Sequence, residues 1–332
     1  MTGRRAGRSA GRRAAFAAAA ALLAGCATST PSIPRPLDQA ASAAPSAGPA
    51  TPPPPPPACG NPVASFAPDG PLPPPGDVPR NSTMALIHAR GRLVVGVDAA
   101  TTLFSARNPL TGQLEGFDVD ILREVSRSLF GSPDRIEYRI IQYSQRVQVL
   151  ERGEVDLVAD TFTINCARWA RINFSSEYFS AGQRLLVRSD SKIDSIKAVD
   201  AAKGSVCVAK GSTNLDNLAP YKNVKVVAVD DLGRCLVLFQ DGSVDAVTAD
   251  DTVLEGFRSE DPYAKVVGPR FSEEPYGIGV SKNRVDLVRY VNAVLERIRA
   301  DGTWKRIYER WLGTPGVAIP EPPPPVYGRR SA

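Results

Sequence analysis

The stretches RVQVLERGEVDLVAD (residues 146–160) and LVLFQDGSVDAVTAD (residues 236–250) decide the fold, because they present one pattern twice. In each stretch, apolar residues at helical spacing are followed by a glycine, Gly153 or Gly242, the residue type that most often ends a helix. A short run rich in branched apolar residues comes next and predicts a buried strand. The repeat therefore predicts two similar α/β units.

A further apolar strand is predicted upstream of each repeat, at 93–97 and at 206–209. Strands that alternate with helices are typical of α/β units with a mostly parallel sheet. We therefore predict two lobes, each a mostly parallel sheet flanked by helices, joined by a two-segment hinge. Lobe 1 is predicted to comprise residues 84–183 and 274–313, and lobe 2 to comprise residues 184–273. A ligand that contacts both lobes should favour a closed state.

The first 25 residues are predicted to be an export signal. Five arginines precede an apolar run at 14–23, which is too short to span a bilayer as a permanent helix. The sequence Leu23-Ala24-Gly25-Cys26 that follows resembles a bacterial lipobox, in which the cysteine is acylated. The alternatives are ordinary cleavage with Cys26 as a bystander, and export by either the general or the twin-arginine route.

Charge argues against a nucleic-acid partner. The formal net charge is +5, and those five arginines account for all of it. The processed chain is then neutral overall and has no global field that would attract it to phosphate backbones. We predict a monomer in the cell envelope, held by its lipid at the outer face of the cytoplasmic membrane.

Two proline-rich segments flank the globular body. Eighteen of the thirty prolines lie between residues 27 and 80, so residues 26–83 are predicted to be an extended tether that cannot fold alone. Residues 314–332, which contain the run 320–325, are predicted to be a frayed tail.

Four cysteines remain once Cys26 is acylated, and an exported protein tends to pair them. Cys207 lies in the predicted strand that opens lobe 2, and Cys235 lies in the helix beside it. We predict a Cys207–Cys235 disulfide, together with a Cys59–Cys166 disulfide that joins the end of the tether to lobe 1.

Polar side chains gather where the predicted strands end, which is where ligands bind in open α/β sheets. An arginine and backbone amides suit a carboxylate, and an acid on the other side suits an ammonium group. Together these groups describe a site for a free α-amino acid. The candidate ligand-binding residues are Asp98, Phe104, Tyr143, Thr161, Thr163, Arg168, Lys210, Ser212, Thr213 and Asp250.

Several motifs across residues 84–313 resemble the polar amino-acid-binding proteins of ABC transporters, the extracellular solute-binding proteins of family 3. The glutamine- and glutamate-binding lipoproteins of actinobacteria are the branch that the chain resembles. The resemblance implies the two-lobed periplasmic-binding (flytrap) fold, a ligand of the glutamine, glutamate, asparagine and aspartate class, and a permease and an ATPase as partners. The motifs are LVVGVD (93–98), GFDVD (116–120), VDLV (155–158), Thr163 with Arg168, FS (174–175), VAKGS (208–212), and GTW (302–304) with Trp311.

The resemblance also implies roles for single residues. Arg168 matches the arginine that binds the α-carboxylate, Thr163 matches a residue that binds the same group, and Asp250 matches the acid that pairs with the α-ammonium. Phe104 and Tyr143 match aromatic residues that close over the ligand side chain.

Other positions are less certain matches. Asp98 falls near a side-chain contact, and the register of Lys210, Ser212, Thr213 and Asn214 is open by one residue. Asp160 departs from the small residue usual in the family, and an acid in the cleft would disfavour an acidic ligand side chain.

Some alternatives stay open at this point. Asp251, rather than Asp250, could face the ligand, and Arg168 could form a surface salt bridge. Asp118 and Asp120, at the start of a helix that runs to Phe130, are interpreted as an N-cap and a first-turn acid and not as ligand contacts. The same fold could also belong to a sensor, or to a dehydratase that uses Asp98 or Asp160 as an acid.

We predict a binding protein that is not an enzyme and that has no cofactor and no metal. The only histidine, His88, precedes the first predicted strand, which excludes a Ser/His or Cys/His nucleophile at the site.

Overall fold

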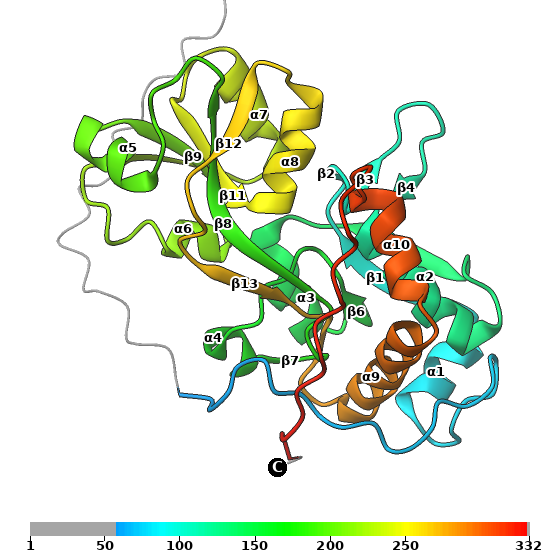
Figure 1. Cartoon of the computed structure of the whole chain (residues 1–332). Helices are drawn as coiled ribbons and strands as arrows, with labels where there is room; N and C mark the ends of the chain where they lie inside the picture. The colour runs from blue at the N-terminus through cyan, green and yellow to red at the C-terminus, as the bar shows by residue number, and fades with distance from the viewer. Residues whose placement is uncertain (1–57, 331–332) are drawn as a thin grey trace, which may run out of the picture. The chain divides into compact units, whose positions relative to one another are not determined.

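A computed structural model of the chain describes residues 58–330. The predicted export signal, the acylated Cys26 and the tether up to residue 57 lie outside the described residues. Two main sheets, each flanked by helices, make up the described part (Figure 1). None of the helices in residues 58–330 is long and apolar enough to cross a membrane.

The sheet of lobe 1 has five strands in the order β5-β1-β6-β14-β7. Strand β1 is parallel to β5 and β6, and β14 is antiparallel to β6 and β7. Every residue of β1 is buried, as expected for a central strand covered on both faces. The strands are β1 (Leu93–Val97), β5 (Ile136–Ile140), β6 (Leu157–Val158), β7 (Ile172–Phe174) and β14 (Gly279–Ser281).

Helices pack on this sheet, and α9 and α10 from the end of the chain lie beside α2 (Figure 1). Helix α3 ends just before Gly153, whose φ of +65° is the left-handed conformation predicted for a glycine at a helix end. The helical elements of lobe 1 are α1 (Thr83–Arg90), α2 (Phe117–Phe130), η1 (Tyr143–Gln145), α3 (Arg146–Glu151), α4 (Cys166–Trp169), α9 (Val285–Ala300) and α10 (Thr303–Leu312).

The sheet of lobe 2 has the order β10-β9-β11-β8-β12, and β13 also pairs with β8. Its strands are β8 (Phe179–Arg188), β9 (Ser205–Ala209), β10 (Lys225–Val229), β11 (Ala246–Asp250), β12 (Ala264–Val267) and β13 (Glu273–Tyr276). Its helices are α5 (Ile196–Ala202), α6 (Thr213–Asp216), α7 (Gly233–Gln240) and α8 (Asp251–Glu260).

The prediction of mostly parallel sheets is wrong, because both sheets are mixed. The chain enters lobe 2 along β8 and returns along β13, and these two strands pair in opposite directions. Strand β8 also runs antiparallel to β11 and β12, while β14 runs antiparallel to its neighbours in lobe 1. The strands that carry the chain between the lobes therefore reverse direction relative to the strands of each α/β unit.

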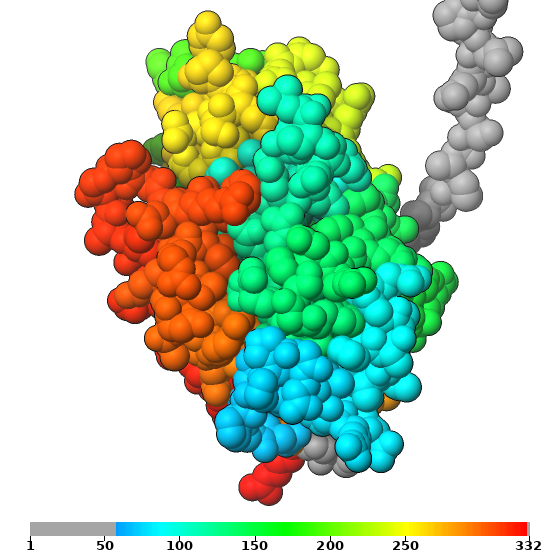
Figure 2. All heavy atoms as spheres, turned by 90° about the vertical axis from the view of Figure 1, so that its right-hand side faces the viewer, coloured from blue at the N-terminus to red at the C-terminus, as the bar shows by residue number. Residues whose placement is uncertain are grey.

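A small sheet of lobe 1 reaches lobe 2. It consists of β2 (Ala100–Thr101), β3 (Ser105–Arg107) and β4 (Leu114–Glu115). The Thr102 hydroxyl beside it donates a hydrogen bond to Glu260, and Gly256 of α8 packs against the Thr102 backbone. Figure 2 shows this contact as green-blue atoms against yellow ones.

Part of the predicted tether and the predicted frayed tail are instead folded against lobe 1. We call residues 58–82 the strap and residues 314–330 the tail. Phe66 of the strap is buried, and Ser65 forms a β-bridge with Tyr327 of the tail. The Trp169 indole donates a 2.7 Å hydrogen bond to the Pro62 carbonyl. The strap and the tail thus bury apolar surface and form backbone hydrogen bonds with each other and with lobe 1. The proline-rich composition of the two segments did not predict this packing.

Both predicted disulfides are confirmed. Cys207 of β9 is bonded to Cys235 of α7, and Cys59 of the strap is bonded to Cys166 of α4. The first lies within lobe 2, and the second fixes the strap to lobe 1.

Loss of the Cys207–Cys235 disulfide should destabilise the protein. The bond closes a loop with a sequence separation of 28 residues. In the chain-entropy account, Cys207→Ala/Cys235→Ala lowers the free energy of unfolding by about 3 kcal/mol. Guanidinium denaturation measures this loss. Wild-type protein in reductant should lose at least as much, and a loss confined to the double variant would point to a cavity instead of the missing cross-link.

Candidate functional site

Contacts between the lobes gather around Gly211, in the turn that follows β9. Its carbonyl oxygen accepts hydrogen bonds from two arginines of lobe 1, at 3.2 Å from Arg146 Nη2 and 3.1 Å from Arg168 Nη2. Close by, the Thr213 hydroxyl of lobe 2 contacts the Thr163 hydroxyl of lobe 1 at 3.2 Å. The predicted residues Thr163, Arg168 and Thr213 are therefore brought together at the interface between the lobes.

Arg168 lies on α4, a helix of four residues. The side chain of Asn165 caps this helix by accepting a 2.8 Å hydrogen bond from the Arg168 backbone amide. The buried guanidinium donates a 2.6 Å hydrogen bond to the Thr163 carbonyl and stacks on the Phe162 ring. Burial, reinforced by the nearby Arg146, lowers the pKa of Arg168 to about 9, so it stays protonated at neutral pH.

Arg168 has no acidic partner among the residues that the structure describes, because its hydrogen bonds go to carbonyl oxygens. The alternative of a surface salt bridge is therefore wrong. A buried cation without an anion is costly, and such sites usually bind a charged ligand or relieve the cost by a pKa shift.

Arg146 was missed by the sequence analysis. It opens α3, which the sequence shows only as a stretch with helical apolar spacing. The residue is 2% exposed, and its guanidinium donates to the carbonyls of Tyr143 at 3.0 Å and Asp160 at 2.9 Å. It also stacks on the Tyr143 ring. Arg146 therefore holds together the loops that follow β5 and β6.

Asp250 supplies an acid from lobe 2. It is buried at the end of β11, where the Tyr276 hydroxyl donates to it at 2.5 Å and the Asn214 side-chain amide at 2.8 Å. Neither partner is cationic. Burial, with the field of Glu274 added, raises the pKa of Asp250 to about 7.

Asp250 and Asp251, the two acids that the sequence analysis left open, have different surroundings. The carboxylate of Asp251 forms a 2.7 Å ion pair with Arg270 at the surface and accepts from the Thr252 amide at 2.9 Å. Of the two, Asp250 forms no ion pair within the part of the chain that the structure describes.

A polar floor lies at the ends of β1 and β6. The Asp98 carboxylate accepts from the Ala100 amide at 2.5 Å and from the Thr101 hydroxyl at 3.0 Å. The Tyr143 hydroxyl lies 3.1 Å from the Thr101 hydroxyl and 3.0 Å from the Thr161 hydroxyl. Asp98, Tyr143 and Thr161 therefore form one buried hydrogen-bonded chain, as expected for residues that follow neighbouring parallel strands.

Asp160 lies beside this chain. One of its carboxylate oxygens accepts from the Asp98 amide at 3.1 Å, and the other has no hydrogen-bond partner among residues 58–330. Burial raises the pKa of Asp160 well above its usual value, and the charge of Asp98 adds to this shift despite the opposing field of Arg146.

Asp118 has a role that its position in the first turn of α2 did not reveal. Its buried carboxylate accepts from the Thr161 amide at 2.8 Å and from the Tyr178 hydroxyl at 2.6 Å. Burial raises its pKa to about 6. Thr161 has a φ of +43°, so this hydrogen bond holds the loop after β6 in an unusual conformation.

Three candidates differ from their predictions. The Lys210 side chain is exposed and pairs with Asp230, because its backbone continues β9 and strand alternation directs it opposite to the buried Ala209. Phe104 is fully buried among the rings of Phe117, Phe179 and Tyr276. It therefore belongs to the core of lobe 1 and does not line the site.

Ser212 also has a structural partner. Its hydroxyl donates to the Ala209 carbonyl at 2.7 Å and accepts from the Leu215 amide at 3.2 Å, so it caps α6. Its neighbour Asn214, which shared the open register of this loop, reaches Asp250 instead.

The chain belongs to the bacterial extracellular solute-binding proteins, family 3, which match residues 93–314. The architecture is accordingly the two-lobed α/β fold of amino-acid-binding proteins, with the residues described above at the junction of the lobes.

Named relatives indicate the branch of the family. The ABC transporter glutamine-binding protein of Bacillus subtilis is 33% identical over 237 residues, which cover 70% of this chain and 85% of that protein. A glutamate-binding protein of Corynebacterium glutamicum is 32% identical over 246 residues, covering 70% of this chain and 83% of that protein. A solved structure of an ancestral arginine-binding protein bound to glutamine has a TM-score of 0.64 and 32% identity, covering 68% of this chain and 99% of that one.

Gly211→Ala should hinder closure of the lobes. Gly211 has a φ of +74°, and a Cβ atom there would lie 2.5 Å from the Ser144 Cα of lobe 1. We expect amino-acid affinity to fall by roughly ten- to a hundredfold, as for overpacking of a tight contact. Small-angle scattering should show less compaction on addition of the ligand.

Gly153→Ala is the matched control, because Gly153 has a similar φ of +65° and no atom within 4 Å of an added Cβ. Equal losses of affinity in the two variants would show that backbone strain, and not the contact between the lobes, causes the effect.

Proposed function

We propose that this protein captures a free polar amino acid between its lobes, with Arg168 binding the α-carboxylate and Asp250 the α-ammonium. One observation carries the proposal: two opposite charges are buried in different lobes near one junction, and each has only neutral partners. A zwitterion supplies the missing counter-charge to both. Thr163 and Thr213, whose hydroxyls meet across the junction, are placed to add hydrogen bonds.

The ligand side chain should be polar. The hydroxyls of Tyr143 and Thr161 together with Asp98 provide both donors and acceptors in a buried setting. The oxygen of Asp160 that has no hydrogen-bond partner among the described residues lies beside them and suits a ligand group that donates hydrogen bonds. Glutamine satisfies both conditions, and the names of the two relatives support a ligand of the glutamine and glutamate class.

The protein delivers this ligand to a membrane transporter and does not transform it. The family is described as extracellular, and one relative is named as a component of an ABC transporter. These findings support a location outside the cytoplasm and a permease and an ATPase as partners. The sequence Leu23-Ala24-Gly25-Cys26 supports acylation of Cys26, which would hold a monomer at the outer face of the cytoplasmic membrane.

Arg168→Ala and Asp250→Ala should each nearly abolish binding while leaving the fold intact. Removal of one partner of a buried pair strands the other charge and costs about 3–5 kcal/mol, or roughly two to four orders of magnitude in affinity. Calorimetry with L-glutamine, and then with the other common amino acids, measures the loss and identifies the preferred ligand.

Arg258→Ala is the control, since this arginine is exposed, pairs with Glu255 at the surface, and should change affinity by less than about 1 kcal/mol. Arg168→Ala with affinity within about threefold of wild type would contradict the assignment of the clamp. The ligand released from the denatured wild-type complex should be chemically unchanged, because a modified ligand would indicate an enzyme.

Affinity for L-glutamine should weaken in acid. The pKa of Asp250 is raised to about 7, so below that pH the empty site holds a proton that the ligand ammonium must displace. We expect affinity to be flat between about pH 7 and 8, before Arg168 begins to lose its proton, and to fall by about tenfold per pH unit below pH 7. Calorimetry at several pH values tests this. Asp250→Asn should bind weakly with no such slope, and a slope retained in that variant would assign the proton to another group.

A further inference from the structure

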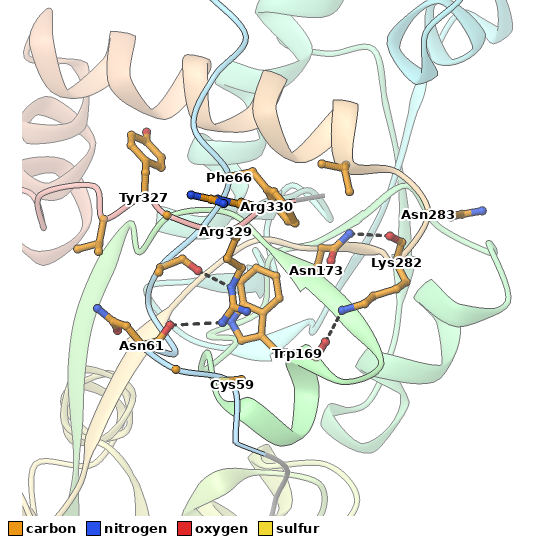
Figure 3. A pocket seen from close by; sticks show the side chains of 15 residues that line it. Cys59, Asn61, Phe66, Trp169, Asn173, Lys282, Asn283, Tyr327, Arg329 and Arg330 are labelled. Carbon is orange, nitrogen blue, oxygen red and sulfur yellow. Dashed lines mark hydrogen bonds between the residues drawn. The ribbon is translucent and has the colours of Figure 1, made fainter. Parts of the chain in front are cut away.

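A second hollow lies on lobe 1, and most of its wall comes from outside the part of the chain that matches the family. The strap, the tail, α4 and the loop after β14 enclose a cavity of about 760 Å³ (Figure 3). The family match covers residues 93–314, so both the strap and nearly all of the tail lie outside the matched range. A cavity built by such segments is a candidate for a function of its own.

The cavity wall is basic. It includes Lys282, Arg329 and Arg330, and none of the described lining residues is acidic. Asparagines and the rings of Trp169, Phe66 and Tyr327 supply the rest of its larger side chains (Figure 3).

Two of these cations are held in fixed positions. The Arg329 guanidinium lies 3.6 Å from the centre of the Trp169 ring and donates to the Ala64 carbonyl at 2.6 Å. Lys282 Nζ donates to the Trp169 carbonyl at 2.6 Å (Figure 3). Neutral groups thus orient both cations, and each retains N–H groups for a further partner.

The charge of these cations is not balanced locally. In the described range, neither Lys282 nor Arg329 forms an ion pair. Burial lowers the pKa of Lys282, and the charge of Arg329 lowers it further. An anion that binds between Lys282 and Arg329 would reduce the repulsion between their positive charges, which favours anion binding at this position.

We propose that this cavity binds a phosphate group, and that the headgroup of an anionic membrane lipid supplies it. Three cations suit a phosphate better than a carboxylate, which needs fewer. The membrane source follows from position: Cys59 lines the cavity, so the segment that leads back to Cys26 reaches lobe 1 at this site. This step rests on the proposed acylation of Cys26. The cavity would then orient the protein on the membrane to which the lipid attaches it.

The test uses residues 27–332, the processed chain without its acyl group, which keeps every described residue. Its binding to vesicles of phosphatidylcholine and phosphatidylglycerol in equal parts is compared with binding to phosphatidylcholine alone. Lys282→Gln/Arg330→Gln should weaken binding to the anionic vesicles by about thirtyfold, at about fivefold per cation near such a surface. Arg329 is left in place because it also holds the strap.

The matched control, Arg152→Gln/Arg258→Gln, removes the same charge from exposed arginines that pair with surface acids elsewhere. Equal weakening in the two double variants, or no preference for anionic vesicles, would overturn the proposal. Calorimetry with inorganic phosphate distinguishes the sources. Phosphate binding that the Lys282→Gln/Arg330→Gln variant loses, without binding to vesicles, supports the phosphate site and overturns the lipid source.

Amino-acid affinity provides an independent readout. Lys282 donates to Trp169 of α4, the helix that carries Arg168, whereas Arg330 has no hydrogen bond to α4 among the described residues, so Arg330→Gln alone should bind L-glutamine like wild type. Vesicle binding without glutamine binding would contradict the proposed function alone, whereas glutamine binding without vesicle binding would contradict only the lipid source proposed for the cavity.

Discussion

Two guanidinium groups of one lobe share a single carbonyl oxygen of the other, and the closed arrangement of the protein depends on that contact. Arg146 and Arg168 can both reach Gly211 because the turn after β9 has no side chain at this position. Like charges approach each other only where strong acceptors compensate for their repulsion. The carbonyls of the loops after β5 and β6 provide this compensation, so the fold of lobe 1 and its meeting with lobe 2 are linked.

Around this contact the protein separates two kinds of buried acid. Asp118 is fully engaged by the Thr161 amide and the Tyr178 hydroxyl, and it shapes a loop. Asp250 accepts hydrogen bonds from neutral groups only, so its negative charge is not balanced by a cation among the described residues. Within each lobe, hydrogen bonds to neutral groups then hold these side chains in position before the ligand arrives. Binding energy is then not used to order the protein groups, which is the advantage of preorganisation.

The features that the sequence predicted well are those with strong local causes. Glycines at helix ends, buried branched strands and cysteines in neighbouring elements are local signals, and they located both α/β units and both disulfides. The direction of the linking strands depends on the path of the chain between lobes, which no local pattern encodes. The prediction for Lys210 did not take into account that its backbone continues β9, whose alternation directs the side chain to the surface. Arg146 was not predicted because the sequence of α3 shows only helical apolar spacing. The strap and the tail were missed because proline-rich composition predicts an extended chain whether or not it packs.

Helix α4 has too few residues to hold its own orientation, since a single turn has little internal hydrogen bonding. Its first residue, Cys166, is bonded to Cys59, and its last, Trp169, donates to the Pro62 carbonyl. The strap therefore stabilises the orientation of the helical turn that carries Arg168. At the proposed site, the angle at which this guanidinium would meet a carboxylate depends partly on residues that lie some thirty positions before the matched region, in a segment whose composition resembles a spacer. In this chain, the attachment of the strap to α4 and the position of the Arg168 guanidinium are therefore coupled.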